Sequence, residues 1–133
     1  MNKKQKELLL KDLCARLPYK VYAQIPDEYG GYTSAIESID IDGFVKDFEG
    51  TQIEVENIKP YLLPLSSMSD EQKQYLKDRF CYDWDGEPYE LWKYQIEIGD
   101  ADELIDWFHK NHFDYRGLIP MGLANDATGK NIY

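Results

Sequence analysis

The sequence is poor in basic residues, in cysteine and in long apolar runs, and each shortage narrows what the chain can do. Its 15 Lys and Arg residues are outnumbered by 25 Asp and Glu, giving a net charge of −10. Because contacts to phosphates need clustered Lys and Arg, this balance argues against direct nucleic-acid binding and against an anionic membrane surface. The acidity is typical of a solubilising surface, of a protein with a basic partner, or of a surface that imitates DNA phosphates.

Only two cysteines are present, Cys14 and Cys81. Cys14 lies within a helical pattern and Cys81 follows the last turn of another, so we interpret both as free thiols in a reducing compartment. Near the start, the apolar run from Leu8 to Leu10 is too short for a signal peptide or a membrane-spanning helix. We therefore expect a cytoplasmic protein.

At 133 residues we expect a single domain spanning residues 1–133. Three segments have helical periodicity. The first covers residues 2–16 and ends before Pro18. The second begins at a Ser69 cap, and the third at an Asp100 cap with Glu103 three positions on. The apolar faces of the second and third helices are expected to include Tyr75, Leu76, Phe80, Ala101, Leu104, Ile105, Phe108 and His112.

Other segments alternate with the period of two that is typical of strands. Residues 19–25 predict a half-buried strand, residues 34–55 a β-meander with turns at Asp42-Gly43 and Glu49-Gly50, and residues 91–98 one more strand. Residues 60–67, with two prolines, are interpreted as a connector outside the sheet. Ile39 and Ile41 should share a face, and the acids of the meander should point largely outward: Glu37, Asp40, Asp42, Asp47, Glu54 and Glu56.

After Phe113 the periodicity stops, and about twenty residues follow that are interrupted by glycine and proline. Apolar residues such as Leu118 and Leu123 favour an irregular strap laid over the core, because disordered tails are usually poor in such residues. The sequence therefore predicts an α+β fold, with an antiparallel sheet of about five strands, three helices and a C-terminal strap.

Two groups of residues are candidate sites. An acidic aromatic loop is expected to expose Trp84, and its candidate protein-binding residues are Tyr82, Asp83, Trp84 and Asp85. A pocket between the third helix and the strap could use His109, His112, Asp114 and Arg116. For Arg116 alone, we favour an ion pair with Asp114 or Asp126 that pins the strap over a place in a pocket for an anion.

Neither group has the pattern of a metal or phosphate site. The histidines are three residues apart, which supplies two ligands at most, and no H-E-x-x-H pattern is present. Asp83, Asp85 and Glu87 lack the spacing of a calcium loop, and the Gly129-Lys130 pair lacks the other residues of a P-loop. We therefore expect no metal and no cofactor.

Three segments together, LLLKDLCARLPY, IKPYLLPLSSMSDEQK and HFDYRGLIPMGLANDATGKNIY, carry a resemblance. The chain resembles a family of short proteins of uncharacterised function that are encoded by gut bacteria, often among phage-related or mobile genes. The resemblance covers about half of the residues, spread over nearly the whole length. It implies no catalytic or binding residue, but it implies a phage or mobile-element context, in which small acidic proteins often bind other proteins.

The sequence thus leaves three functions open. The first is a non-enzymatic protein-binding module that uses the loop around Trp84. The second is an enzyme or small-ligand domain with the pocket that contains His109 and Arg116. The third is an acidic decoy for a DNA-binding protein.

Overall fold

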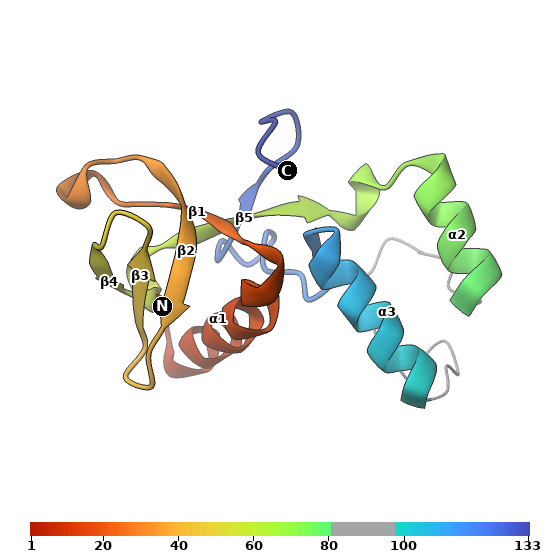
Figure 1. Ribbon diagram of the computed structural model, residues 1–133, viewed down its shortest axis with the longest axis horizontal. Helices are drawn as coiled ribbons and strands as arrows, with labels where there is room; N and C mark the ends of the chain where they lie inside the picture. Colours follow the sequence, from red (N-terminus) through yellow and green to blue (C-terminus); the bar gives the residue numbers. More distant parts are fainter. Residues whose placement is uncertain (81–97) are drawn as a thin grey trace.

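A computed structural model describes residues 1–80 and 98–133 of the chain. In it, three helices accompany a mixed, mostly antiparallel sheet, so the fold is α+β (Figure 1). The helices are α1 (Lys3–Arg16), α2 (Asp70–Phe80) and α3 (Ile98–Lys110). The strands are β1 (Tyr22–Gln24), β2 (Thr33–Ile39), β3 (Phe44–Asp47), β4 (Gln52–Glu54), β5 (Lys59–Pro64), β6 (Phe113–Asp114) and β7 (Asn125–Asp126).

The sheet runs in the order β4-β3-β2-β1-β5-β6, and β7 also pairs with β5. Strands β1 to β5 pair antiparallel, whereas β6 and β7 both run parallel to β5. The described part of the chain therefore has seven short strands, whereas about five were expected over the whole chain. The three that were not predicted are β5, β6 and β7, and the strand predicted over residues 91–98 lies outside the described residues except for Ile98, which begins α3. The β-meander and its two turns are confirmed.

Strand β5 corrects the prediction that residues 60–67 form a connector outside the sheet. Pro60 pairs with Ala23 of β1, and Pro64 lies opposite Asp114 of β6. The two prolines are four residues apart, so their nitrogens, which carry no N–H, face the same side of the strand. On the opposite side the N–H of Leu63 donates to the carbonyl of His112 at 2.8 Å, so this part of the ladder is intact.

The helix ends follow local signals with one exception. Ser69 and Gln72 exchange side-chain hydrogen bonds with each other's backbone N–H groups, the capping box that the sequence predicts. Helix α3, however, begins at Ile98, so Asp100 lies in its first turn instead of capping it. Asp100 and Glu103 form ion pairs with Arg79 of α2 instead, and these pairs join the two helices.

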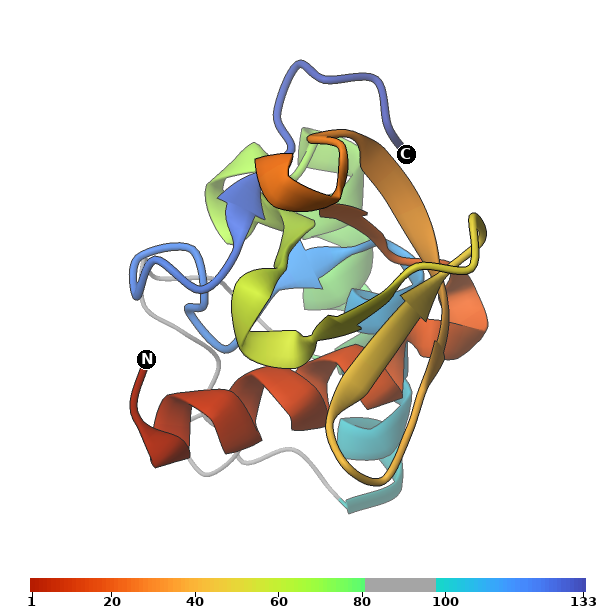
Figure 2. The same cartoon turned by 90° about the vertical axis from the view of Figure 1, so that its left-hand side faces the viewer.

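Two apolar clusters form the core of the part of the chain that the structure describes. The larger lies between α1 and the sheet, and Figure 2 shows α1 running across one side of the strands. The smaller joins α2, α3 and β6, and it includes Leu76, Leu104 and Phe108. Val21, Ala23 and Ile25, which were predicted to form the inward face of one strand, are all fully buried.

Two predictions about exposure, for Ile41 and Tyr75, were wrong, and one acid departs from the outward orientation that the other acids of the meander largely follow. Ile41 is 98% exposed because it lies in the turn between β2 and β3, where the alternation no longer applies. Asp47 is buried and not outward, because its carboxylate accepts N–H groups from Glu49 and Thr51 in the next turn. Tyr75 is 44% exposed, whereas Leu76 beside it is fully buried.

The strap predicted after Phe113 packs on the core. Leu118 and Leu123 belong to the larger apolar cluster, and β7 pairs with β5. At the end of the strap, the Tyr133 hydroxyl accepts the N–H of Tyr22 at 3.0 Å and donates to the carbonyl of Tyr61 at 2.7 Å. Burial, the main cause, raises the pKa of Tyr133 to about 12.

Candidate functional site

A fully buried ion pair lies on the inner face of α1. Asp12 and Arg16 are four residues apart, each has no exposed surface, and Arg16 Nε donates to Asp12 Oδ2 at 2.7 Å. The Nη2 group of Arg16 also donates to the carbonyl of Phe113 at 2.6 Å. The pair therefore fastens the first helix to the start of the strap, since an uncompensated charge would be costly here.

Arg116 of the strap approaches the same carboxylate. Its Nε lies 3.1 Å from Asp12 Oδ1, and 3.0 Å from the hydroxyl of Tyr115, to which it donates. One N–H cannot point well at both oxygens, so the contact with Asp12 is an ion pair without an aligned hydrogen bond. The predicted partners of Arg116 were Asp114 and Asp126, and the structure corrects both to Asp12 because the strap turns back over α1.

His109 lies on the inner face of α3 and is only 7% exposed. Its Nε2 is 2.7 Å from the Tyr115 hydroxyl. Burial, followed by the positive charges of Arg16 and Arg116, lowers the pKa of His109 to about 4. The imidazole is therefore neutral near pH 7, and it links α3 to the strap through Tyr115.

His112 makes different contacts from His109. Its backbone has φ 64°, and its ring stacks on Tyr133 with centroids 3.6 Å apart and an interplanar angle of 12°. Burial is the main cause that lowers the pKa of His112 to about 4. Its Nδ1 is buried and has no hydrogen-bond partner among the described residues.

Asp114 holds the first turn of the strap. Its two carboxylate oxygens accept the N–H groups of Leu118 at 2.9 Å and Ile119 at 2.8 Å. Burial raises the pKa of Asp114, although these two hydrogen bonds act in the opposite direction. Of the four residues predicted to line a pocket, the structure thus brings His109 and Arg116 to one tyrosine, whereas His112 and Asp114 make separate contacts.

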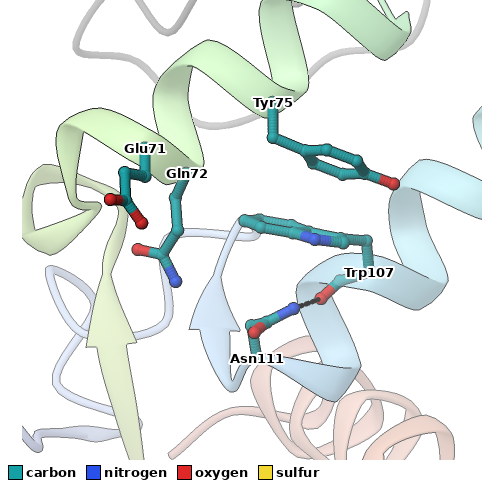
Figure 3. Close-up of a pocket in the computed structure, with 5 residues that line it drawn as sticks. All are labelled: Glu71, Gln72, Tyr75, Trp107 and Asn111. Atoms are coloured by element: carbon teal, nitrogen blue, oxygen red, sulfur yellow. Dashed lines mark hydrogen bonds between the residues drawn. The ribbon is translucent and has the colours of Figure 1, made fainter.

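A hollow of about 230 Å³ opens between α2 and α3 (Figure 3). Tyr75 of α2 stacks over Trp107 of α3, with ring centroids 6.0 Å apart and an interplanar angle of 26°. The indole also stacks on Phe113, with ring centroids 5.6 Å apart, and both rings belong to or pack against the smaller apolar cluster. An exposed tyrosine therefore stacks on a half-buried tryptophan, which in turn stacks on the buried ring of Phe113.

Polar side chains also line this hollow. Glu71 and Gln72 precede Tyr75 by one helical turn, and Asn111 follows Trp107 by one turn (Figure 3). Asn111 Nδ2 donates to the carbonyl of Trp107 at 2.9 Å, which leaves its side-chain oxygen able to accept a bond. The hollow thus combines two aromatic faces with one carboxylate and two amides.

Tyr82, Asp83, Trp84 and Asp85 lie outside the described residues, so the structure does not test the binding loop predicted there. Within residues 1–80 and 98–133, no group of three His, Cys, Asp or Glu side chains could hold a metal ion. None of the helices in that same part of the chain is long and apolar enough to cross a membrane. Cys14 is a free, exposed thiol on α1.

The sequence held a signal for the buried ion pair that our interpretation missed. Leu9 and Leu13 mark the core face of the first helix, and Asp12 and Arg16 continue that face at the same spacing. Opposite charges four residues apart on an apolar face indicate a compensated buried pair. The hollow between α2 and α3 had no such signal, because it depends on how two helices distant in sequence pack together.

Comparison with known proteins adds no relative: no protein-family model, no curated protein and no solved structure matches the chain.

Proposed function

We propose that this protein is a non-enzymatic protein-binding module and that the hollow between α2 and α3 is its contact surface. The observation that carries the proposal is the pair formed by Tyr75 and Trp107. Tyr75 is 44% exposed, while the indole beneath it is fixed by stacking on Phe113. Exposed tyrosine and tryptophan on a rigid support are typical anchors of protein interfaces.

The ionisable residues of the interior support a structural role better than a catalytic one. Asp12, Arg16 and Arg116 interact with one another, and Asp114 accepts two backbone N–H groups. His109 is nearly buried and contacts Tyr115. These groups hold α1, α3 and the strap together, so an active site built from them would have to give up the contacts that order it.

The size of the hollow favours a protein partner over a free small molecule. Pockets that enclose drug-sized ligands usually measure about 300–1,000 Å³, whereas this hollow measures about 230 Å³. It can take in one side chain, and the rest of the contact would come from the surrounding surfaces of α2 and α3. The net charge of −10 would attract a basic partner.

Affinity capture with matched variants tests the proposal. The full chain is used as bait in a nuclease-treated lysate of the host cell, beside Tyr75→Ala and Tyr29→Ala. Tyr29 is 39% exposed on a different element, so it controls for the loss of an exposed aromatic ring. We expect a protein that the wild type and Tyr29→Ala both recover and Tyr75→Ala loses; equal recovery by all three would contradict the proposal.

The other expectations from the sequence stay predictions. The protein-binding loop around Trp84 is one of them. The phage or mobile-element context, the pocket with His109 and Arg116, and the acidic decoy also stay open. Loss of the partner upon Tyr75→Ala would favour the module over the decoy, because that substitution leaves the acidic charge unchanged.

A further inference from the structure

The lining of the hollow between α2 and α3 has the chemistry of a cation site. Within the described residues, the side chains that line it comprise two aromatic rings, one carboxylate and two amides, with no basic residue among them. The lysines of α2, Lys73 and Lys77, do not line it. Aromatic faces attract cations through the quadrupole of the ring, and a carboxylate at the rim adds a direct charge interaction.

The polar groups at the rim are available to a ligand. Within the described residues Glu71 forms no ion pair, whereas nearby Arg79 is already paired with Asp100 and Glu103. The carbonyl oxygen of Gln72 accepts the N–H of Ser69, and Asn111 uses its Nδ2 group on α3. One carboxylate and the Asn111 side-chain oxygen therefore remain to accept hydrogen bonds from an incoming donor.

We infer that the hollow binds the guanidinium of an arginine side chain presented by a basic protein partner. This inference rests on the proposed protein-binding function and names its ligand. A guanidinium is planar, so it can stack on the Tyr75 or Trp107 ring while its N–H groups reach Glu71 and Asn111. A lysine ammonium could reach the carboxylate, but it lacks a flat face to stack.

Size and charge fit this assignment. The volume of about 230 Å³ is below that of pockets for drug-sized ligands and is open at the exposed Tyr75, as one side chain of a larger partner requires. The protein carries a net charge of −10, which steers positively charged partners toward its surface. The aromatic pair then gives the selectivity for arginine that diffuse charge alone does not supply.

Titration of the isotope-labelled full chain by NMR tests the inference. The probe is an acetylated, amidated peptide, Gly-Ser-Arg-Gly-Ser-Arg-Gly-Ser, beside two analogues in which lysine or the uncharged citrulline replaces arginine. The readout is the indole N–H signal of Trp107, assigned with the variant Trp107→Phe. We expect this signal to shift with the arginine peptide, to shift less with the lysine peptide, and to stay in place with the citrulline peptide.

Variants distinguish the contribution of ring stacking to peptide binding from that of nonspecific charge attraction. Tyr75→Ala should weaken binding of the arginine peptide by about 3- to 30-fold, whereas Tyr75→Phe, which keeps the ring, should retain it. Glu71→Gln should weaken it by about 2- to 5-fold. Asp70→Asn is the matched control, since it removes the same charge from the same helical turn outside the hollow, and it should have no such effect.

Three results would overturn the inference: an unmoved Trp107 signal, equal binding of the citrulline peptide, or equal losses from Glu71→Gln and Asp70→Asn. Affinity capture tells the two proposals apart. If the arginine peptide fails but a partner is still recovered in a manner that depends on Tyr75, only the ligand assignment is wrong. If neither binds, the protein-binding function is wrong as well.

Discussion

Removing the Asp12 carboxylate should destabilise the protein more than removing either arginine that it compensates. Asp12 lies 2.7 Å from Arg16 and 3.1 Å from Arg116, and both Asp12 and Arg16 are fully buried. Asp12→Ala leaves the Arg16 guanidinium buried without its counter-charge. Breaking a buried pair in this way typically costs about 3–5 kcal/mol, a large part of the roughly 5–15 kcal/mol by which most domains are stable.

The other variants of this cluster follow from the same contacts. Arg16→Met should cost less, about 1–3 kcal/mol, because Asp12 keeps Arg116 and the main loss is the donor to the Phe113 carbonyl. In the double variant, Asp12→Ala with Arg16→Met, both fully buried charges are gone. Arg116 is 18% exposed, so its charge is partly hydrated. The double variant should therefore be at least as stable as Asp12→Ala alone.

Urea unfolding followed by circular dichroism measures these differences. With a slope of about 2 kcal/mol/M, a loss of about 4 kcal/mol moves the midpoint for Asp12→Ala down by about 2 M. Arg116→Gln serves as the control at the exposed edge of the cluster and should move the midpoint least. The reasoning is refuted if the loss in free energy of unfolding of the double variant equals the sum of the losses of Asp12→Ala and Arg16→Met, since the two charges would then not compensate each other.

Three further predictions concern the strap and the histidines. The pKa values of His109 and His112 are about 4 in the folded protein, below the ordinary histidine value of 6.5, so the unfolded chain binds more protons than the folded chain between pH 4 and pH 6.5. The free energy of unfolding should therefore fall as the pH drops from 6.5 to 4, although the raised pKa of Asp114 acts in the opposite direction and offsets part of the loss. In urea titrations at several pH values, His109→Gln should make the free energy of unfolding depend less on pH. Tyr133→Phe keeps the stacked ring but loses two hydrogen bonds to backbone groups, so it should lower stability by about 1–2 kcal/mol in thermal unfolding. Asp114→Asn replaces one carboxylate oxygen, which accepts a backbone N–H, with an amide NH₂ group that cannot accept it. Amide hydrogen exchange should therefore become faster in the strap residues that follow, and unchanged exchange would contradict the role of Asp114 in holding the first turn of the strap.

Local signals were enough to predict most of the regular elements. The expected first helix over residues 2–16 matches α1, Lys3–Arg16, and the capping box at Ser69 begins α2 as predicted. The alternation through Val21, Ala23 and Ile25 identified a buried strand face. These features depend on neighbours within a few residues of each other, which is the range that periodicity and capping patterns report.

Features that depend on distant partners were predicted poorly. β5 contains Pro60 and Pro64, and it joins the sheet only because β1 and two segments of the strap supply its neighbours. The partner of Arg116 lies on the first helix, about a hundred positions away in the chain, so no local pattern could identify it. The strap itself was predicted from its apolar residues, but its two short strands were not.

The candidate binding surface between α2 and α3 is also a feature that depends on residues distant in the sequence. Tyr75 looked like part of an apolar helix face, and its exposure depends on where α3 lies. Trp107 gave no sign in the sequence of pairing with a ring about thirty positions earlier. The interpretation of the sequence therefore turned to the aromatic loop around Trp84, whereas the described part of the structure directs attention to the two helices on either side of it in the chain.

Photo-crosslinking in the host cell tests the central claim most directly. A benzoylphenylalanine is placed at Tyr75, which lines the hollow, or at Tyr29, which lies on another element and is similarly exposed. A protein-binding hollow predicts a discrete adduct from position 75, absent from position 29, that maps to an arginine-containing segment of a basic protein. No adduct at position 75, or the same adducts from both positions, would contradict the claim that this hollow is a protein-binding surface.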